Sequence, residues 1–421
     1  MPADSEAVGT NTEFLFSRLW AVGFLVLMSV TWPLWFRSTE SGFPMIPLIP
    51  LLASTSFLTL AAGSFCSLTL GSLLLVIVCS RKHQRLCWYG VSVTLLLCFI
   101  IDQHRIQPWA YQTFFYATLF ALNPPGRWKS WMIPLAASIY LYSAAGKFDL
   151  QFINTVGQDF LFSLPGPLAH LMETTSPETR QWFALVFPAT ELSIAASLCF
   201  KRLRYYAGAA AICMHISLII VLGPWLENHS SGVLIWNVLL VAQNHYLFLS
   251  DRNAASLTNP VKSATTRWMR VRFFVLGSMW FIALFAPCLE RKGFWDHWTS
   301  WSLYSPHTSR AKIEIHQSAV TQLTQSLQQS LKEDRDMDSW REIDLGTWSL
   351  RTRGVPIYPQ ARYQLCLAKE IADRLNSNDE LRVKLQSSSN RWSGQREEEQ
   401  LLNRDEINRA FSSYWLTPKH D

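Results

Sequence analysis

Long runs of apolar residues alternate with short polar segments up to Leu289, and no run of that length occurs after Glu290. A helix needs about 20 mostly apolar residues to cross a bilayer. We therefore expect about nine transmembrane helices, at 14–36, 56–79, 86–101, 108–122, 131–147, 182–200, 205–226, 233–249 and 273–289. The first run exceeds the roughly 7–15 residues of a signal-peptide core, so we expect it to remain as an anchor. The polar residues 1–13 are expected to form a disordered tail.

The pattern changes after Glu290, where the chain becomes polar and charged. Alternating positions predict strands, and spacings of three and four predict helices. We expect strands at 311–316, 341–351 and 379–386 and helices at 318–332, 361–375 and 397–411. The sequence therefore predicts two parts. An all-α polytopic membrane domain spans 14–289, and a small soluble α+β domain spans 290–421.

The loops between the apolar runs differ in charge. The loops at 81–85, 126–130, 201–204 and 251–272 are basic, whereas those at 37–55, 102–107 and 227–232 carry one Arg each at most. Positive loops stay in the cytoplasm. With nine spans, this places the N-terminus in the cytoplasm and the C-terminal domain outside, in the plasma (inner) membrane. Arg105, in the outer loop 102–107, is the exception to the pattern.

Composition supports a membrane protein and excludes several other classes. Only 16% of residues are charged, against about 25% in soluble proteins. The net charge of +6 is accounted for by the basic loops, and no basic stripe with interleaved aromatics indicates nucleic-acid binding. The eight cysteines form no CxxC pair or zinc motif, and the scattered His and carboxylates predict no metal site. Cys288 and Cys366 can pair if their side is oxidising, which their spacing alone does not decide.

Lys147 ends an apolar run within the stretch YLYSAAGKF, 140–148. A lysine there either extends its ammonium to the headgroups or has a depressed pKa and acts as a base. The predicted topology places Asp102, Arg105 and Asp149 at the same outer boundary. Asp102 and Arg105 either form a plain ion pair, or Arg105 holds an anion near the positive end of the helix that begins at Pro108.

Glu191 and His215 lie inside predicted spans, where ionisable groups are costly and face the protein interior. Glu191 either bonds a neighbouring helix or belongs to a proton or substrate path. His215 is its potential partner, although a lone interior histidine is usually a packing residue. The chain contains no HExxH, GxSxG, P-loop or dinucleotide motif.

At YLYSAAGKFD, 140–149, the sequence resembles the membrane domain of the vitamin K-dependent gamma-carboxylases and their bacterial relatives, the horizontally transferred transmembrane (HTTM) proteins. The segments 102–112, 223–237 and 296–305 resemble the more distant DoxX-like proteins. The resemblance implies that Lys147 is a catalytic base toward a quinone-like cofactor on the outer side, with Tyr140 and Asp149 at matching positions. The carboxylases carry two adjacent lysines, whereas Gly146 precedes Lys147 here.

Three hypotheses follow for the function. The first is a membrane-embedded enzyme in which Lys147, supported by Asp102 and Arg105, acts on a quinone-like or lipid-borne substrate. Tyr140, Asp149, Glu191 and His215 then contact that substrate. The second is a non-enzymatic membrane scaffold or assembly partner for redox or secreted proteins, in which the C-terminal domain binds a protein. The third is a transporter with Glu191 and His215 on a proton path, although no paired halves with broken helices are visible. Membrane lipids are partners in all three.

Overall fold

The computed structural model describes residues 2–36, 42–49, 57–123, 126–164, 166–250, 267–334 and 336–413. The predicted basic linker at 251–272 lies outside the described residues up to position 266. The helical part comprises α1 (Pro2–Val30), α2 (Trp32–Trp35), α3 (Phe57–Val78), α4 (Arg81–Ile101), η2 (Gln103–Arg105), α5 (Pro108–Leu122), α6 (Trp128–Lys147), α7 (Leu150–Asn154), α8 (Val156–Phe162), α9 (Pro167–Thr174), α10 (Pro177–Ala184), α11 (Val186–Cys199), α12 (Arg204–Val221), α13 (Ser231–Asn244), η3 (His245–Leu249), α14 (Arg267–Phe285) and η4 (Ala286–Lys292).

Seven helical stretches of the described residues are long and apolar enough to cross a membrane. They are Asn11–Val30, Leu60–Val78, Arg81–Ile101, Pro177–Cys199, Arg204–Val221, Ser231–Leu249 and Arg267–Lys292. The prediction of a mostly helical fold with several membrane-length helices is confirmed, and these helices suggest a membrane protein. The count of nine spans is not confirmed. The two other predicted spans correspond to α5 and α6. Helix α5 has only 15 residues, and all but two of them are buried among the other helices.

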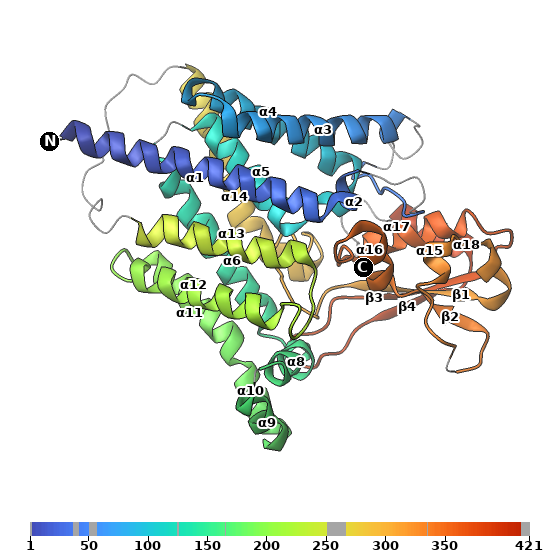
Figure 1. Ribbon diagram of the computed structural model, residues 1–421. Coiled ribbons are helices and arrows are strands. Elements are labelled where there is room, and N and C mark those ends of the chain that lie inside the picture. The colour runs from blue at the N-terminus through green and yellow to red at the C-terminus, as the bar shows by residue number, and fades with distance from the viewer. Residues whose placement is uncertain are drawn as a thin grey trace.

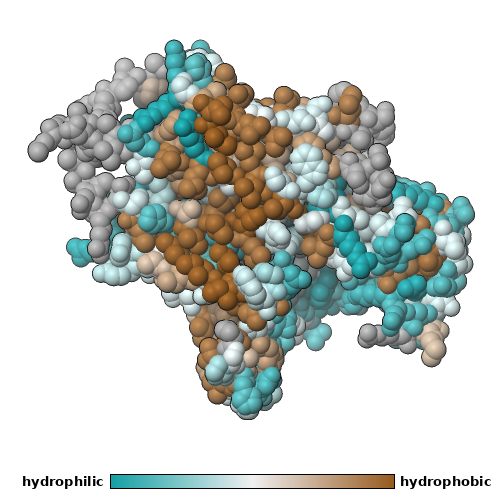
Figure 2. Space-filling model, viewed as in Figure 1, coloured by the Kyte–Doolittle hydropathy of each residue, from teal (hydrophilic) through white to brown (hydrophobic). Residues whose placement is uncertain are grey.

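The long helices lie side by side, and the C-terminal sheet lies at the end of them away from the N-terminus (Figure 1). Figure 2 shows a broad hydrophobic surface over the helices, while the C-terminal domain is mostly hydrophilic. Large apolar side chains are exposed on the helical part, including Leu60, Trp182 and Phe274. A surface of this size on a soluble monomer is unusual, and it fits a lipid environment.

Two helix starts differ from the sequence prediction. Helix α1 begins at Pro2, within the segment predicted to be a disordered tail. Helix α4 begins at Arg81, so the basic segment 81–85 forms its first turn and is not a loop. Ser80 precedes this turn in an extended conformation, which is the backbone geometry of an N-cap residue. The expected proline-started helix is found, since Pro108 is the first residue of α5.

The C-terminal domain contains a four-stranded antiparallel sheet in the order β2-β1-β3-β4. Its strands are β1 (Arg310–His316), β2 (Trp340–Glu342), β3 (Leu381–Gln386) and β4 (Glu398–Leu401). Ile313 of β1 lies opposite Val383 of β3, and both are fully buried. The helices are η5 (Gln317–Gln322), α15 (Gln325–Gln328), α16 (Leu345–Arg353), α17 (Ala361–Ala372) and α18 (Arg404–Ser413). The predicted mixture of strands and helices is therefore present.

Three C-terminal segments differ from the sequence prediction. The strand expected at 341–351 ends at Glu342, because Asp344 caps α16 by accepting from the Thr347 amide. The helix expected at 397–411 starts as β4, which pairs with β3. The helix expected at 318–332 is divided into η5 and α15. Cys288 is exposed and Cys366 is buried, and both are free thiols.

Helices α12 and η3 approach each other closely at Gly208. A Cβ added to Gly208 would lie 2.5 Å from the Cβ of Phe248, which cannot rotate away. We expect Gly208→Ala to destabilise the protein by about 1–3 kcal/mol, the usual cost of overpacking a core. Gly63→Ala in α3 is the matched control, because its added Cβ meets nothing within 4 Å. Thermal unfolding in detergent micelles measures both, and equal unfolding temperatures would contradict the predicted contact.

Candidate functional site

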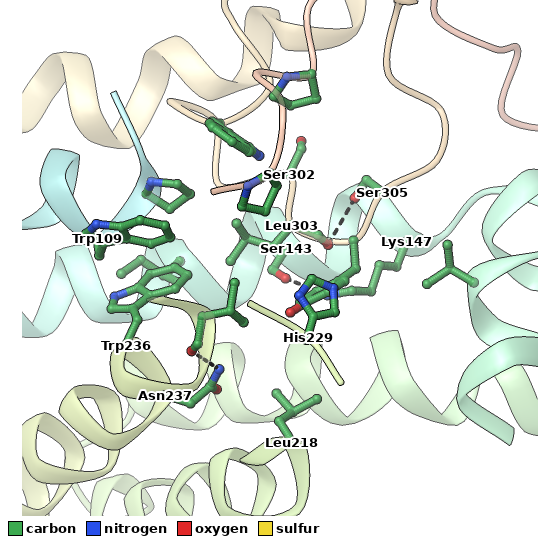
Figure 3. Close-up of a pocket in the computed structure, with 18 of the residues that line it drawn as sticks. Trp109, Ser143, Lys147, Leu218, His229, Trp236, Asn237, Ser302, Leu303 and Ser305 are labelled. Atoms are coloured by element: carbon green, nitrogen blue, oxygen red, sulfur yellow. Dashed lines mark hydrogen bonds between the residues drawn. The ribbon is translucent and has the colours of Figure 1, made fainter. Parts of the chain in front are cut away.

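A cavity of about 340 Å³ lies where α6, α12 and α13 meet loops of the C-terminal domain. Figure 3 shows residues of both parts of the chain around it, including Trp109 and Trp236 from the helices and Ser302 and Ser305 from the loops. Most of the lining is apolar or aromatic, and Trp298 and Tyr304 also contribute to it. This volume is at the lower end of the roughly 300–1,000 Å³ found for small-molecule pockets.

Lys147 and Glu191 form a buried ion pair in the cavity wall. The Lys147 Nζ lies 2.8 Å from each carboxylate oxygen of Glu191 and donates to Ser143 Oγ at 2.6 Å. Ser143 and Lys147 are four residues apart in α6, so they share one helix face. Glu191 comes from α11, which packs along α6. All three ammonium protons therefore have acceptors within the protein.

A second series of hydrogen bonds joins α6, α12 and α13 through buried polar side chains. Asn237 Nδ2 donates to the Val233 carbonyl, and a dashed line marks this bond at Asn237 in Figure 3. The Asn237 Oδ1 therefore faces His215 Nδ1 at 2.8 Å. His215 Nδ1 must therefore carry the proton, and Nε2 accepts from the Tyr140 hydroxyl at 2.8 Å. Asn244 Nδ2 donates to the same hydroxyl oxygen at 2.7 Å. With the Tyr140 hydroxyl as the donor, this network suits a neutral imidazole.

Four of the predicted site residues line this cavity, namely Tyr140, Lys147, Glu191 and His215. The predicted partnership between Glu191 and His215 is not found, because Glu191 pairs with Lys147 and His215 with Tyr140 and Asn237. Sequence reasoning missed Ser143 and the two tryptophans, although the position of Ser143 four residues before Lys147 was a usable signal.

Asp102 and Arg105 are placed elsewhere. The Asp102 carboxylate is fully buried and bonds Arg353 of α16, and Arg105 Nε lies 3.7 Å from it. Arg105 also donates to the backbone carbonyls of Leu34 and Trp35. This network joins the ends of the helices to the C-terminal domain. None of Asp102, Arg105 and Arg353 is among the cavity-lining residues, contrary to the expected support of Lys147.

Asp149 also has a structural role outside the cavity. Its Oδ1 accepts from the Gln151 amide and so caps α7, and its Oδ2 lies 3.2 Å from Arg291 at the end of η4. A carboxylate at a helix N-terminus with an arginine partner is well satisfied. Asp149 is not among the cavity-lining residues.

One grouping of potential metal ligands is present among the described residues, formed by Glu290, His297 and His307. All three are buried, and their ligand atoms lie within 4.8 Å of one another. The sequence prediction of no metal site rested on the lack of a linear motif, and these residues follow no standard zinc spacing.

Two titratable groups of the cavity wall outside the spans are held neutral. Burial lowers the pKa of His229, and burial raises the pKa of Tyr304. Of the described residues that line the cavity, Lys147 and Glu191 are therefore the charged pair in an apolar aromatic surround. Such a site can bind a flat apolar molecule and offer it one exchangeable proton. Comparisons with protein-family models, with curated proteins and with solved structures find no match to this chain.

Proposed function

We propose that this chain is a membrane protein that binds a lipophilic, ring-containing molecule of the quinone class in the cavity beside Lys147. The proposal rests on the Lys147–Glu191 pair at the wall of a cavity that is otherwise apolar and aromatic. Indole rings such as those of Trp109 and Trp236 bind flat rings through their faces. The resemblance of 140–149 to the gamma-carboxylases and HTTM proteins is consistent with this class of ligand.

In the proposed enzymatic step, Lys147 acts as a base on a ring hydroxyl of the reduced ligand. Lys147 first passes one proton to Glu191, which leaves a neutral amine and a carboxylic acid. The ligand O–H bond then breaks and an N–H bond forms at Lys147, so the ring oxygen becomes an anion beside the new ammonium. A bound apolar ligand favours this route, because excluding water removes the solvent that stabilises the separated charges of the pair.

The proposed topology has nine spans, with α5 and α6 crossing inside the bundle, a cytoplasmic N-terminus and an external C-terminal domain in the plasma membrane. In support, Arg85 donates to the Leu122 carbonyl, so the basic start of α4 lies at the same end as the C-terminus of α5. At the other end, Asp102 and Gly146 contact the C-terminal domain. Short spans are tolerated where neighbouring helices shield them from lipid.

Binding of a short-chain 1,4-naphthoquinone and its hydroquinone to the full chain in nanodiscs tests the proposal. Quenching of tryptophan fluorescence reports the quinone, and displacement reports the hydroquinone. We expect the double variant Lys147→Met/Glu191→Gln to bind the hydroquinone about tenfold or more weakly, since a hydrogen bond to a charged group contributes about 1.5–3 kcal/mol. The double change avoids leaving one charge buried without its partner.

Lys201→Met is the control, because Lys201 is an exposed lysine in the turn before α12. It is expected to bind both probes as the unmodified chain does. If the unmodified chain binds neither probe, or if the double variant binds the hydroquinone equally well, the quinone proposal fails.

The alternative is a non-enzymatic membrane scaffold that binds a protein through its C-terminal domain. The observation in its favour is the exposure of Met337 and Trp392 on that domain, at 87% and 82%. Large exposed apolar side chains occur at protein interfaces. Crosslinking from position 337 or 392 in intact membranes tests it. The same partner captured from both positions and lost in Trp392→Ser would support the scaffold, whereas no reproducible partner would count against it.

A further inference from the structure

Glu290, His297 and His307 converge at the boundary between η4 and the C-terminal domain. They are 5%, 1% and 0% exposed, respectively. Glu290 Oε1 contacts His297 Nδ1 and lies 2.8 Å from His307 Nε2. Two imidazoles and one carboxylate thus direct one atom each to a common point that water does not reach.

The hydrogen bonds of His307 call for either a proton or a metal ion at this point. His307 Nδ1 lies 3.1 Å from the Gly146 carbonyl oxygen, which only accepts, so Nδ1 carries the hydrogen. In a neutral imidazole, Nε2 then presents a lone pair to the Glu290 oxygen. Two lone pairs at that distance repel each other unless a proton or a metal ion lies between them. His297 Nδ1 also faces the Glu290 oxygen, and it becomes a third ligand atom for a metal ion when its hydrogen moves to Nε2.

We propose that Glu290, His297 and His307 bind one divalent transition-metal ion of the zinc type. Two imidazole nitrogens and one carboxylate are a standard set of three protein ligands for zinc. The Gly146 carbonyl acts as the outer partner that orients His307 through its other ring nitrogen.

Metal binding changes the tautomer of His297. Without metal, the Ser309 amide donates to His297 Nε2 at 3.0 Å, so Nδ1 carries the proton. In the metal-bound form Nδ1 is a ligand and Nε2 carries the proton, which Ser309 Oγ at 3.3 Å accepts. One proton leaves Nδ1 and one is gained at Nε2, so the imidazole stays neutral. Because the hydrogen bond from the Ser309 amide to His297 Nε2 is lost, the affinity for the metal is lower than that of a site whose histidines already have the required tautomer.

The ion holds the cavity wall in place. Ser305 and Thr308 line the cavity on either side of His307, and Gly146 precedes Lys147 in α6. A bond from the ion to His307 thus links the loop after η4 to the helix that carries Lys147. The role is structural, because His307 itself is not among the residues that line the cavity.

The full chain in nanodiscs, stripped with a chelator and then dialysed separately against Zn²⁺ and Co²⁺, tests the proposal. We expect about one ion per chain by elemental analysis and a visible Co²⁺ spectrum of a low-symmetry nitrogen and oxygen site. His307→Asn keeps a donor for the Gly146 carbonyl but lacks the ligand nitrogen, and Glu290→Gln keeps the shape of the side chain. Both are expected to lose the ion and the rise in unfolding temperature that the ion produces.

His316→Asn is the matched control, because His316, the last residue of β1, bonds Ser318 of η5 and lies outside the grouping. It is expected to retain the ion. The unmodified chain alone decides the main question: if it takes up neither ion, a shared proton occupies the site and the metal proposal is wrong. Equal metal content in Glu290→Gln would also overturn it. Neither readout depends on binding of a quinone, so this proposal can fail or stand independently of the proposed function.

Discussion

Glu191→Gln is expected to destabilise the folded protein by about 3–5 kcal/mol, the usual cost of removing one partner from a buried ion pair. Lys147 is 3% exposed, and its ammonium donates to both oxygens of the Glu191 carboxylate. With glutamine in place, the positive charge stays buried and keeps only neutral acceptors, one of them Ser143. Unfolding by heat and by denaturant in the same detergent measures the difference.

The double variant Lys147→Met/Glu191→Gln distinguishes the contribution of the ion pair to stability from the contribution of side-chain packing. It is expected to be more stable than Glu191→Gln alone, because no uncompensated charge remains, and the mutant cycle gives the coupling energy. Glu178→Gln is the control. Glu178 is an exposed carboxylate at the start of α10, and its replacement is expected to change stability by less than about 0.5 kcal/mol. A Glu191→Gln protein as stable as that control would show that the pair contributes little.

The sequence could predict which residues are costly in a membrane but not which partner each one has. A lysine at the end of an apolar run and a glutamate within another are visible in the linear pattern, and both line the cavity. Their pairing depends on α6 and α11 lying side by side, although they are 44 residues apart at the contact. No local spacing rule reports such a contact, and His215 was an equally reasonable partner on sequence alone.

Asp102, Arg105 and Asp149 illustrate the opposite case. The sequence assigns them to the Lys147 site, because the predicted topology places all of them at one boundary. In the structure their partners lie far away in the sequence, where a linear pattern does not reveal them. Arg353 is 251 residues from Asp102, and Arg291 is 142 residues from Asp149. A boundary crowded with charged residues therefore contains several separate networks, and membership of the boundary does not define membership of the site.

The strands were predictable where both faces of the sheet had a clear pattern. β1 and β3 alternate between buried and less buried positions, and both were predicted. β4 was not, because three of its four residues, Glu398–Leu401, are polar and exposed, and it is a strand only by pairing with β3. Edge strands of this kind take their conformation from the neighbouring strand more than from propensity.

Asp102→Asn is expected to cost about 3–5 kcal/mol, because it leaves the guanidinium groups of Arg105 and Arg353 buried without a carboxylate. Both arginine side chains are 1% exposed, so neither can recover its charge stabilisation from water. Arg353 belongs to the C-terminal domain and Asp102 to the helical part, so the damage is concentrated at their junction. We therefore expect the C-terminal domain of this variant to become sensitive to protease before the helical part unfolds.

Limited proteolysis across a denaturant series measures this separation, with tryptophan fluorescence reporting overall unfolding. Glu342→Gln is the control, because its ion pair with Lys332 is partly exposed and is worth at most about 1 kcal/mol. Adding Arg353→Gln to Asp102→Asn is expected to restore part of the stability, since one of the two unpaired charges is then removed. Cleavage of Asp102→Asn at the same denaturant concentration as the Glu342→Gln control would mean that packing alone, without the Asp102 network, holds the domain against the helices.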